Sequence, residues 1–173
     1  MCPVGEPKNE GCFFVKGKYD RYQRTSPFYG ILAAFESWVG QILTGSDEDL
    51  FYWKSRLNES LGHIGQVMVD LVPNLKWVIG EQEPVPKLGP NENQNRIKLA
   101  LVRFAIAIAQ PQNPLLLFLD DLQWADPASL GYLETLLMLR QEVALMLAVS
   151  FREEEECDAA AGQWQSQNEP VLT

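Results

Sequence analysis

The most constraining feature of the 173-residue sequence is an apolar run, Leu115 to Leu119, that ends in two adjacent aspartates, Asp120 and Asp121. A short run that is apolar throughout is typical of a strand covered on both faces, as parallel strands are. Residues 143–149 form a second apolar run, and the Asp-Pro pair at 126–127 predicts the start of a helix between the two. Strand, helix and strand in this order predict a βαβ unit.

The N-terminal part of the sequence predicts one more strand and several helices. The run Cys-Phe-Phe-Val at 12–15 is predicted to be a buried strand that runs into a loop. Helical spacing of apolar residues predicts helices over 27–44, 46–62, 64–72 and 95–109. Thr25 or Ser26 is expected to cap the first of these and Ser46 the second. Residues 80–94 are predicted to be an exposed loop because they are rich in proline, glycine and acids.

These elements predict an α/β fold, a parallel sheet flanked by helices, with a helical insertion between the first strand and the strand at 115–119. We expect a single domain at 12–152, because 173 residues are enough for one α/β core and short for two. Residues 1–11 have the composition of a disordered leader. Residues 153–173 have that of an acidic, polar tail.

Composition argues against several functional classes. A formal charge of −9 disfavours binding to nucleic acid or to an anionic membrane. The sequence has no apolar run near the roughly 20 residues needed to span a bilayer, and no secretory signal at its start, so we predict a cytoplasmic protein. His63 is the only histidine and the three cysteines form no C-x-x-C pair, which disfavours histidine triads, zinc sites and a disulfide framework.

Asp120 and Asp121 are the candidate functional residues. Carboxylates at the C-terminal edge of a parallel sheet lie where α/β proteins bind ligands. In P-loop NTPases the first such acid holds Mg²⁺ and a neighbouring acid orients the attacking water. The same two residues also fit a plain loop followed by a helix cap, so the acid pair by itself leaves both interpretations open.

A longer stretch of sequence around the two aspartates resembles a known protein family. Residues 119–130, LDDLQWADPASL, closely resemble the Walker B region of AAA-type and STAND signalling ATPases. Residues 17–24 with 27–29, and residues 93–96, are similar to segments of predicted ATPases in multidomain kinases and sensor proteins. The resemblance extends over roughly residues 11–153. It is specific because several motifs match, and no single motif carries it. It implies a partial P-loop NTPase fold that uses ATP and Mg²⁺.

The resemblance also implies roles for three residues. Asp120 would coordinate Mg²⁺ and Asp121 would polarise the attacking water. Arg152, in the string Val-Ser-Phe-Arg at 149–152, would sense the γ-phosphate. The alternative for Arg152 is a strand-end arginine paired with the glutamates that follow it.

The sequence departs from the family in its phosphate loop. It has no G-x-x-x-x-G-K-[ST] motif, and its single Gly-Lys pair, Gly17-Lys18, is followed by Tyr19. In the family the P-loop and its helix precede the first strand, which predicts that the chain begins just after them. We therefore expect weak nucleotide binding and little or no hydrolysis by the chain alone, and an ATPase if a P-loop completes it.

The alternative function is a non-catalytic protein-interaction module derived from such an ATPase. In either case the resemblance implies protein partners or attached kinase or sensor domains. The missing P-loop motif is the sequence feature that favours this alternative.

Overall fold

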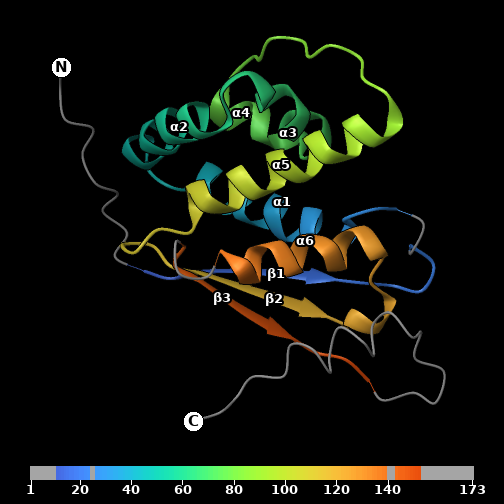
Figure 1. Ribbon diagram of the computed structural model, residues 1–173. Coiled ribbons are helices and arrows are strands. Elements are labelled where there is room, and N and C mark those ends of the chain that lie inside the picture. Colours follow the sequence, from blue (N-terminus) through green and yellow to red (C-terminus); the bar gives the residue numbers. More distant parts are fainter. Residues whose placement is uncertain (1–10, 24–25, 140–142, 153–173) are drawn as a thin grey trace.

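The computed structural model describes residues 11–23, 26–139 and 143–152. Three parallel strands form one sheet in the order β1 (Phe13–Lys18), β2 (Leu115–Asp120) and β3 (Leu145–Val149) (Figure 1). Within the described residues five α-helices connect β1 to β2, and one α-helix connects β2 to β3: α1 (Tyr29–Leu43), α2 (Asp47–Leu61), α3 (Gly65–Leu71), α4 (Lys76–Ile79), α5 (Pro90–Ile108) and α6 (Pro127–Met138). The same residues include three short 3-10 helices, at Gly62–Ile64, Pro73–Leu75 and Leu122–Trp124. The predicted α/β class and the helical insertion are confirmed.

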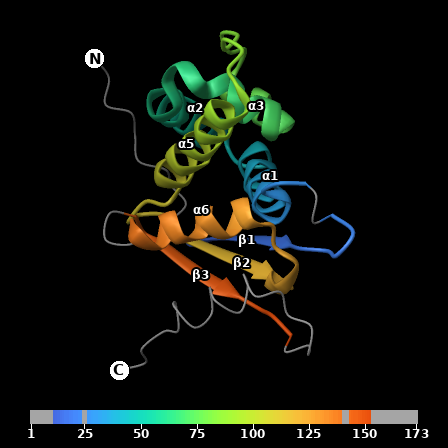
Figure 2. The ribbon, with the colours of Figure 1, turned by 45° about the vertical axis from the view of Figure 1, so that its right-hand side comes forward.

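The helices form two layers on the same face of the sheet. Helices α1 and α6 lie against the strands, and α2 to α5 lie farther from the sheet (Figures 1 and 2). Both connections step in the same direction along the sheet, from β1 to β2 to β3. Right-handed crossovers that step in one direction place their helices on one face, which accounts for this arrangement.

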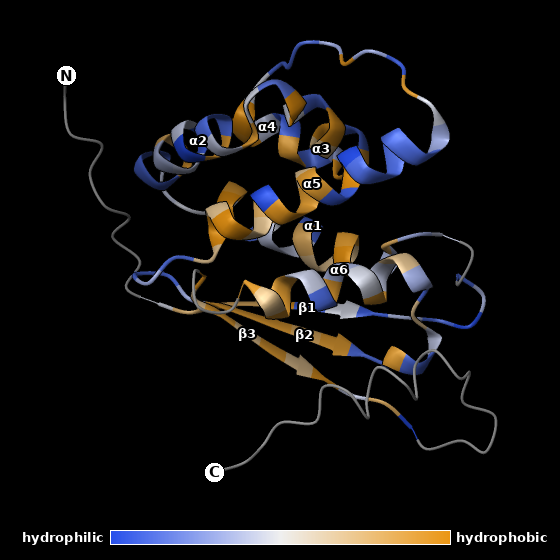
Figure 3. Ribbon diagram, viewed as in Figure 1, coloured by the Kyte–Doolittle hydropathy of each residue, from blue (hydrophilic) through white to orange (hydrophobic). Residues whose placement is uncertain are grey.

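The opposite face of the sheet has no helix over it among the described residues, and it is apolar toward the start of the strands, whereas Lys16 and Lys18 extend from it nearer their ends. Phe14, Leu116 and Met146 are in register across this face, and Phe14 and Met146 are 53% and 66% exposed. The strands are apolar along most of their length (Figure 3). Residues 115–119 were predicted to be covered on both faces, and within the described residues they are fully covered on one.

A close contact between two glycines places β1 under the start of α1. A Cβ atom on Gly17 would lie 2.0 Å from the carbonyl oxygen of Gly30, and one on Gly30 would lie 2.7 Å from the ring of Tyr19. Only residues without a Cβ allow the strand and helix backbones to approach this closely. The contact fixes the position of β1, whose lysines Lys16 and Lys18 flank Gly17.

An aromatic cluster fills the space between the sheet and the outer helices. Trp38 and Trp53 are fully buried and meet edge to face with ring centroids 5.1 Å apart. Phe13 and Phe104 pack against them in the same geometry. These two tryptophans are packing residues, since edge-to-face aromatic pairs stabilise a core.

Several boundaries differ from the prediction. The first strand was predicted over 12–15, but β1 continues to Lys18 because Lys16 and Lys18 alternate outward while Val15 and Gly17 face the helices. The loop predicted at 80–94 ends earlier, since α5 begins at Pro90. Proline is favoured in the first helical turn, and the Glu92 carboxylate accepts a hydrogen bond from the Gly89 N–H at 3.2 Å.

The predicted helix caps have mixed outcomes. Ser46 caps α2 and Asp126 caps α6, as predicted, each accepting a hydrogen bond from a backbone N–H of the first turn. The predicted cap of α1 is wrong for Ser26, because Phe28, in the left-handed region, precedes the helix and no side chain caps it. Thr25 lies outside the described residues, as do the predicted leader, apart from Gly11, and the predicted tail.

No helix in the described part of the chain is long and apolar enough to cross a membrane.

Candidate functional site

The ends of the three strands bring a group of polar side chains to one edge of the sheet. Asp120 is the last residue of β2, and the Ser150 hydroxyl, one residue after β3, donates a hydrogen bond to its Oδ1 at 2.5 Å. The same hydroxyl accepts a hydrogen bond from the Asp121 N–H at 3.2 Å. Ser150 thus holds the side chain of one aspartate and the backbone of the next, and we call the surroundings of Asp120 and Asp121 the aspartate site.

Asp121 makes the turn that leaves β2. Its φ of 56° lies in the left-handed region, which aspartate tolerates better than most residues. The turn points the Asp121 carboxylate toward the other strand ends, where Oδ1 lies 3.2 Å from Nε2 of Gln123 and 3.5 Å from Nε of Arg152. The backbone N–H of Arg152 in turn donates to Oε1 of Gln123 at 3.3 Å.

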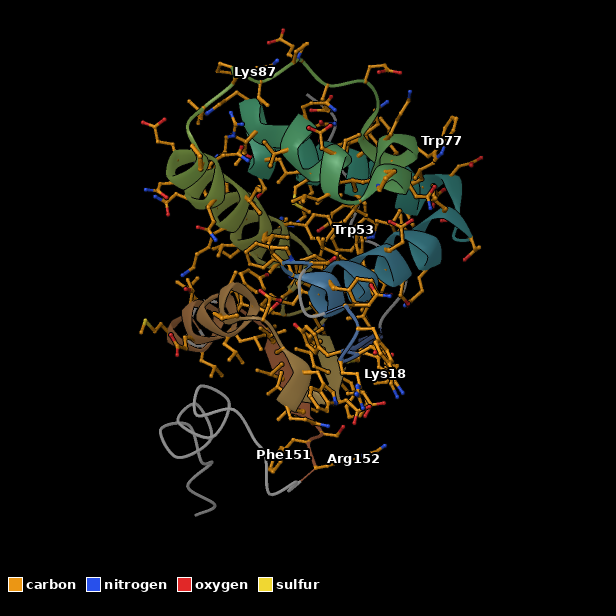
Figure 4. The ribbon with its side chains drawn as sticks, turned by 90° about the vertical axis from the view of Figure 1, so that its right-hand side faces the viewer. Lys18, Trp53, Trp77, Lys87, Phe151 and Arg152 are labelled. Carbon is orange, nitrogen blue, oxygen red and sulfur yellow. The ribbon has the colours of Figure 1, made fainter. Side chains whose placement is uncertain are left out.

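Two lysines of β1 approach the aspartates from the other side. Lys16 Nζ lies 3.4 Å from Oδ2 of Asp120. Lys18 Nζ lies 3.0 Å from Oδ2 of Asp121 and 3.8 Å from Oδ2 of Asp120, so it bridges the two carboxylates. Figure 4 shows Lys18 at the same end of the sheet as Arg152. The site therefore combines two carboxylates with three cationic side chains.

These contacts favour the charged forms of both aspartates. The hydrogen bond from Ser150, and next the contact with Lys16, lower the pKa of Asp120 below its usual value. The hydrogen bond from Lys18 lowers the pKa of Asp121 in the same way, and the Asp121 carboxylate raises the pKa of Lys18. Stabilisation of the charged form of each group accounts for both directions.

Replacing Ser150 by alanine removes the largest of these effects on Asp120. We expect Ser150→Ala to raise the pKa of Asp120 toward its usual value, because the hydroxyl donates to the charged carboxylate. The pKa is measured by carboxyl ¹³C NMR over an acid titration. Ser37→Ala, on the exposed side of α1, is the control and is expected to leave Asp120 unchanged. An Asp120 pKa equal in wild type and Ser150→Ala would contradict the assignment.

A second, buried carboxylate holds the loop that follows the site. Asp126 Oδ1 accepts from the Ser129 N–H at 2.9 Å, and Oδ2 accepts from the Phe28 N–H at 3.1 Å and from the Ser129 hydroxyl. The phenol of Tyr19 is buried beside this group, and burial raises its pKa. Asp126 thereby ties the start of α6 to the start of α1, 98 residues earlier in the sequence.

The structure brings together the three residues selected from the sequence. Asp120 and Asp121 are adjacent, and Arg152 reaches Asp121. The glutamates offered as alternative partners of Arg152 lie outside the described residues. Sequence reasoning gave no role at this site to Lys16, Lys18 or Gln123. The alternation of two lysines at the end of a strand is a signal that would have found the first two, because such residues share one face.

A family model for the AAA ATPase domain matches residues 6–149, which is most of the chain. The chain belongs to the AAA ATPase domain family. Hybrid signal transduction histidine kinase G of Dictyostelium discoideum is 37% identical to it over 124 residues, or 72% of this chain. The chain spans 4% of the length of that relative. No solved structure matches the sequence.

Membership of the AAA ATPase domain family suggests the use of a nucleotide and Mg²⁺, and the aspartate site supplies donors of the right type. Mg²⁺ prefers hard oxygen ligands and keeps several waters, so one or two carboxylates are sufficient. The side chains of Asp120 and Asp121 are 25% and 13% exposed, and solvent can reach both. Within the described residues no group of three or more acidic, histidine or cysteine side chains forms a metal-ligand cluster. The chemistry of the two carboxylates therefore fits a hydrated Mg²⁺ ion.

Proposed function

We propose that this AAA ATPase domain supplies the metal-binding and phosphate-sensing half of an ATP site in a signal-transduction protein. The observation that carries the proposal is the meeting of Asp120, Asp121 and Arg152 at the carboxyl ends of adjacent parallel strands. This edge is where open α/β sheets bind their ligands. The name of the Dictyostelium relative supports a place in signal transduction.

In the proposed site Asp120 holds Mg²⁺, as in the Walker B region of AAA and STAND ATPases. Bound Mg²⁺ supplies charge stabilisation to the transferring phosphoryl group. Ser150 orients the Asp120 carboxylate through its hydrogen bond. Asp121 accepts a hydrogen bond from the attacking water. Because its pKa is lowered, Asp121 is a weak base and is better suited to orient the water than to remove its proton.

Arg152 is proposed to read the γ-phosphate. Its guanidinium lies 3.5 Å from the Asp121 carboxylate, and its side chain is 70% exposed. An exposed arginine at this edge can turn to a phosphate, for which its planar fork of donors is well suited. The sequence contains no P-loop motif, so we propose that phosphate binding by the 173 residues alone is weak and that hydrolysis needs a P-loop from elsewhere.

The proposal is tested by titrating the chain with Mg·ATP in a calorimeter. We expect saturable binding that is lost in EDTA, and a Kd at least about tenfold weaker in Asp120→Asn, because an amide is a poorer ligand for Mg²⁺ than a carboxylate. Glu59→Gln, on the exposed side of α2, removes one negative charge away from the site and is expected to bind as the wild type does. Equal affinity of wild type and Asp120→Asn would overturn the assignment of Asp120.

A second candidate function is a non-catalytic interaction module, and the apolar part of the sheet that no described helix covers favours it. Phe14 and Met146 are large, apolar and exposed on a parallel sheet, a type of sheet that is ordinarily covered on both faces. The expected occupant is a helix with an apolar stripe, the usual cover of such a sheet. A wild-type chain that shows no saturable binding of Mg·ATP would favour this function over the first.

A further inference from the structure

The lysines of β1 lie beside carboxylate oxygens of Asp120 and Asp121 that would hold a metal ion. Each of the four carboxylate oxygens of Asp120 and Asp121 already has a donor or cation close to it. Ser150 occupies Oδ1 of Asp120, while Gln123 and Arg152 occupy Oδ1 of Asp121. The two remaining oxygens face lysine ammonium groups. Metal coordination at these two oxygens would place the metal ion close to at least one ammonium group, and the like charges repel each other.

Lys18 is the lysine that contacts both aspartates. Its Nζ is 3.0 Å from Asp121 and 3.8 Å from Asp120, whereas the ion pair of Lys16 is with Asp120 at 3.4 Å. Lys16 also lies over the ring of Phe118, with Nζ 5.3 Å from the centroid, and this contact gives it a second partner. A divalent cation bound to either carboxylate would therefore compete with Lys18.

We infer that Lys18 is a built-in competitor of the divalent cation, holding the two aspartates while the metal is absent and leaving them when it binds. The inference rests on the proposed function of the site. Lys18 can leave at little cost because its side chain is 58% exposed and its ammonium is readily hydrated. The divalent ion carries twice its charge and is favoured at the same oxygens once it is present.

This arrangement has a consequence for the state without metal. Two adjacent carboxylates without counter-ions repel each other, and the repulsion would act on the turn at Asp121, which already has a left-handed backbone. Lys18, together with Lys16 and Arg152, offsets that repulsion. Two of these three positive charges come from β1, so the state of the metal site is linked to the position of that strand.

The test compares Mn²⁺ binding to the wild type and to Lys18→Met, with Mn²⁺ alone as the probe and no nucleotide, followed by calorimetry or by electron paramagnetic resonance of the free ion. We expect Lys18→Met to bind Mn²⁺ about two- to fivefold more tightly, the range over which exposed ion pairs change an equilibrium constant. Lys16→Met is expected to give a smaller gain.

Lys87→Met is the matched control. Lys87 is exposed in the segment between α4 and α5, at the end of the molecule away from Lys18 (Figure 4), and its replacement removes the same unit of charge. We expect it to bind Mn²⁺ as the wild type does. A second readout is thermal unfolding, in which added Mn²⁺ should raise the Tm of Lys18→Met by more than that of the wild type.

An affinity of Lys18→Met for Mn²⁺ that is unchanged or weaker, or an absence of Mn²⁺ binding in both proteins, overturns the inference. An equal gain in Lys87→Met overturns it too, since the effect would then be one of net charge. The proposed function is tested separately by Asp120→Asn and Mg·ATP. Loss of Mg·ATP binding in that variant together with no effect of Lys18→Met would leave the function supported and remove the role of Lys18.

Discussion

Gly17→Ala is expected to lower the free energy of unfolding by about 3 kcal/mol, the upper part of the range for a group forced into a packed site. The added Cβ would lie 2.0 Å from the carbonyl oxygen of Gly30 and 2.9 Å from a methyl group of Leu119. The first neighbour is helix backbone, so either β1 or α1 must shift. The change is measured by urea unfolding followed by circular dichroism.

The control for this prediction is another glycine. Gly40, on the exposed side of α1, has no heavy atom within 4 Å of the position of an added Cβ. Gly40→Ala is expected to raise the free energy of unfolding by about 0.5–1 kcal/mol, because alanine is the better helix former. The two glycine-to-alanine changes should therefore have opposite signs. Equal stability of Gly17→Ala and the wild type would show that β1 and α1 do not approach as closely as described.

Asp126→Ala is expected to lower the free energy of unfolding by about 2–4 kcal/mol. The change removes the cap of α6, in which Asp126 accepts from the Ser129 N–H, and the loss of this cap costs about 1 kcal/mol. It also leaves the Phe28 N–H without its acceptor. Asp126 is 5% exposed, so water replaces that bond poorly, and a buried donor left unsatisfied costs about 1–3 kcal/mol.

Ser46→Ala is the matched control because Ser46 caps α2 with a single backbone hydrogen bond in a more exposed place. Its expected loss is about 1 kcal/mol. Asp126→Asn, which keeps the size of the side chain and one carbonyl acceptor, should be intermediate. Thermal and urea unfolding of the four proteins would check the order. A loss in Asp126→Ala no larger than that in Ser46→Ala would contradict the role of Asp126 as a link between two helices.

The fold class could be predicted because its main signals are local. The apolar run 115–119 and the Asp-Pro pair at 126–127 specify a strand and a helix start without reference to the rest of the chain. The start of α1 could not be predicted in this way. Phe28 adopts a left-handed backbone, and its N–H bonds to Asp126, which is distant in the sequence. That tertiary contact replaces the local cap expected from Ser26.

Only part of the candidate site could be predicted from the sequence. Asp120 and Asp121 follow an apolar strand, and that pattern identifies them. Their partner Lys18 comes from β1, and the sequence does not state which strands are neighbours. The register that pairs Lys18 with Asp120 is a property of the assembled sheet. The roles of Asp120, Asp121 and Arg152 in nucleotide chemistry stay predictions, to be checked by the titrations described above.

The order of the strands also bears on how the site forms during folding. Residues paired between β2 and β3 are about 30 positions apart, and those paired between β1 and β2 are about 100 apart, so closing the longer loop costs about 1 kcal/mol more in chain entropy. We therefore expect β2, α6 and β3 to associate before β1 joins them. Ser150 and Arg152 would then reach the aspartates early and Lys18 late, so the part of the neutralisation that β1 supplies would be among the last events of folding.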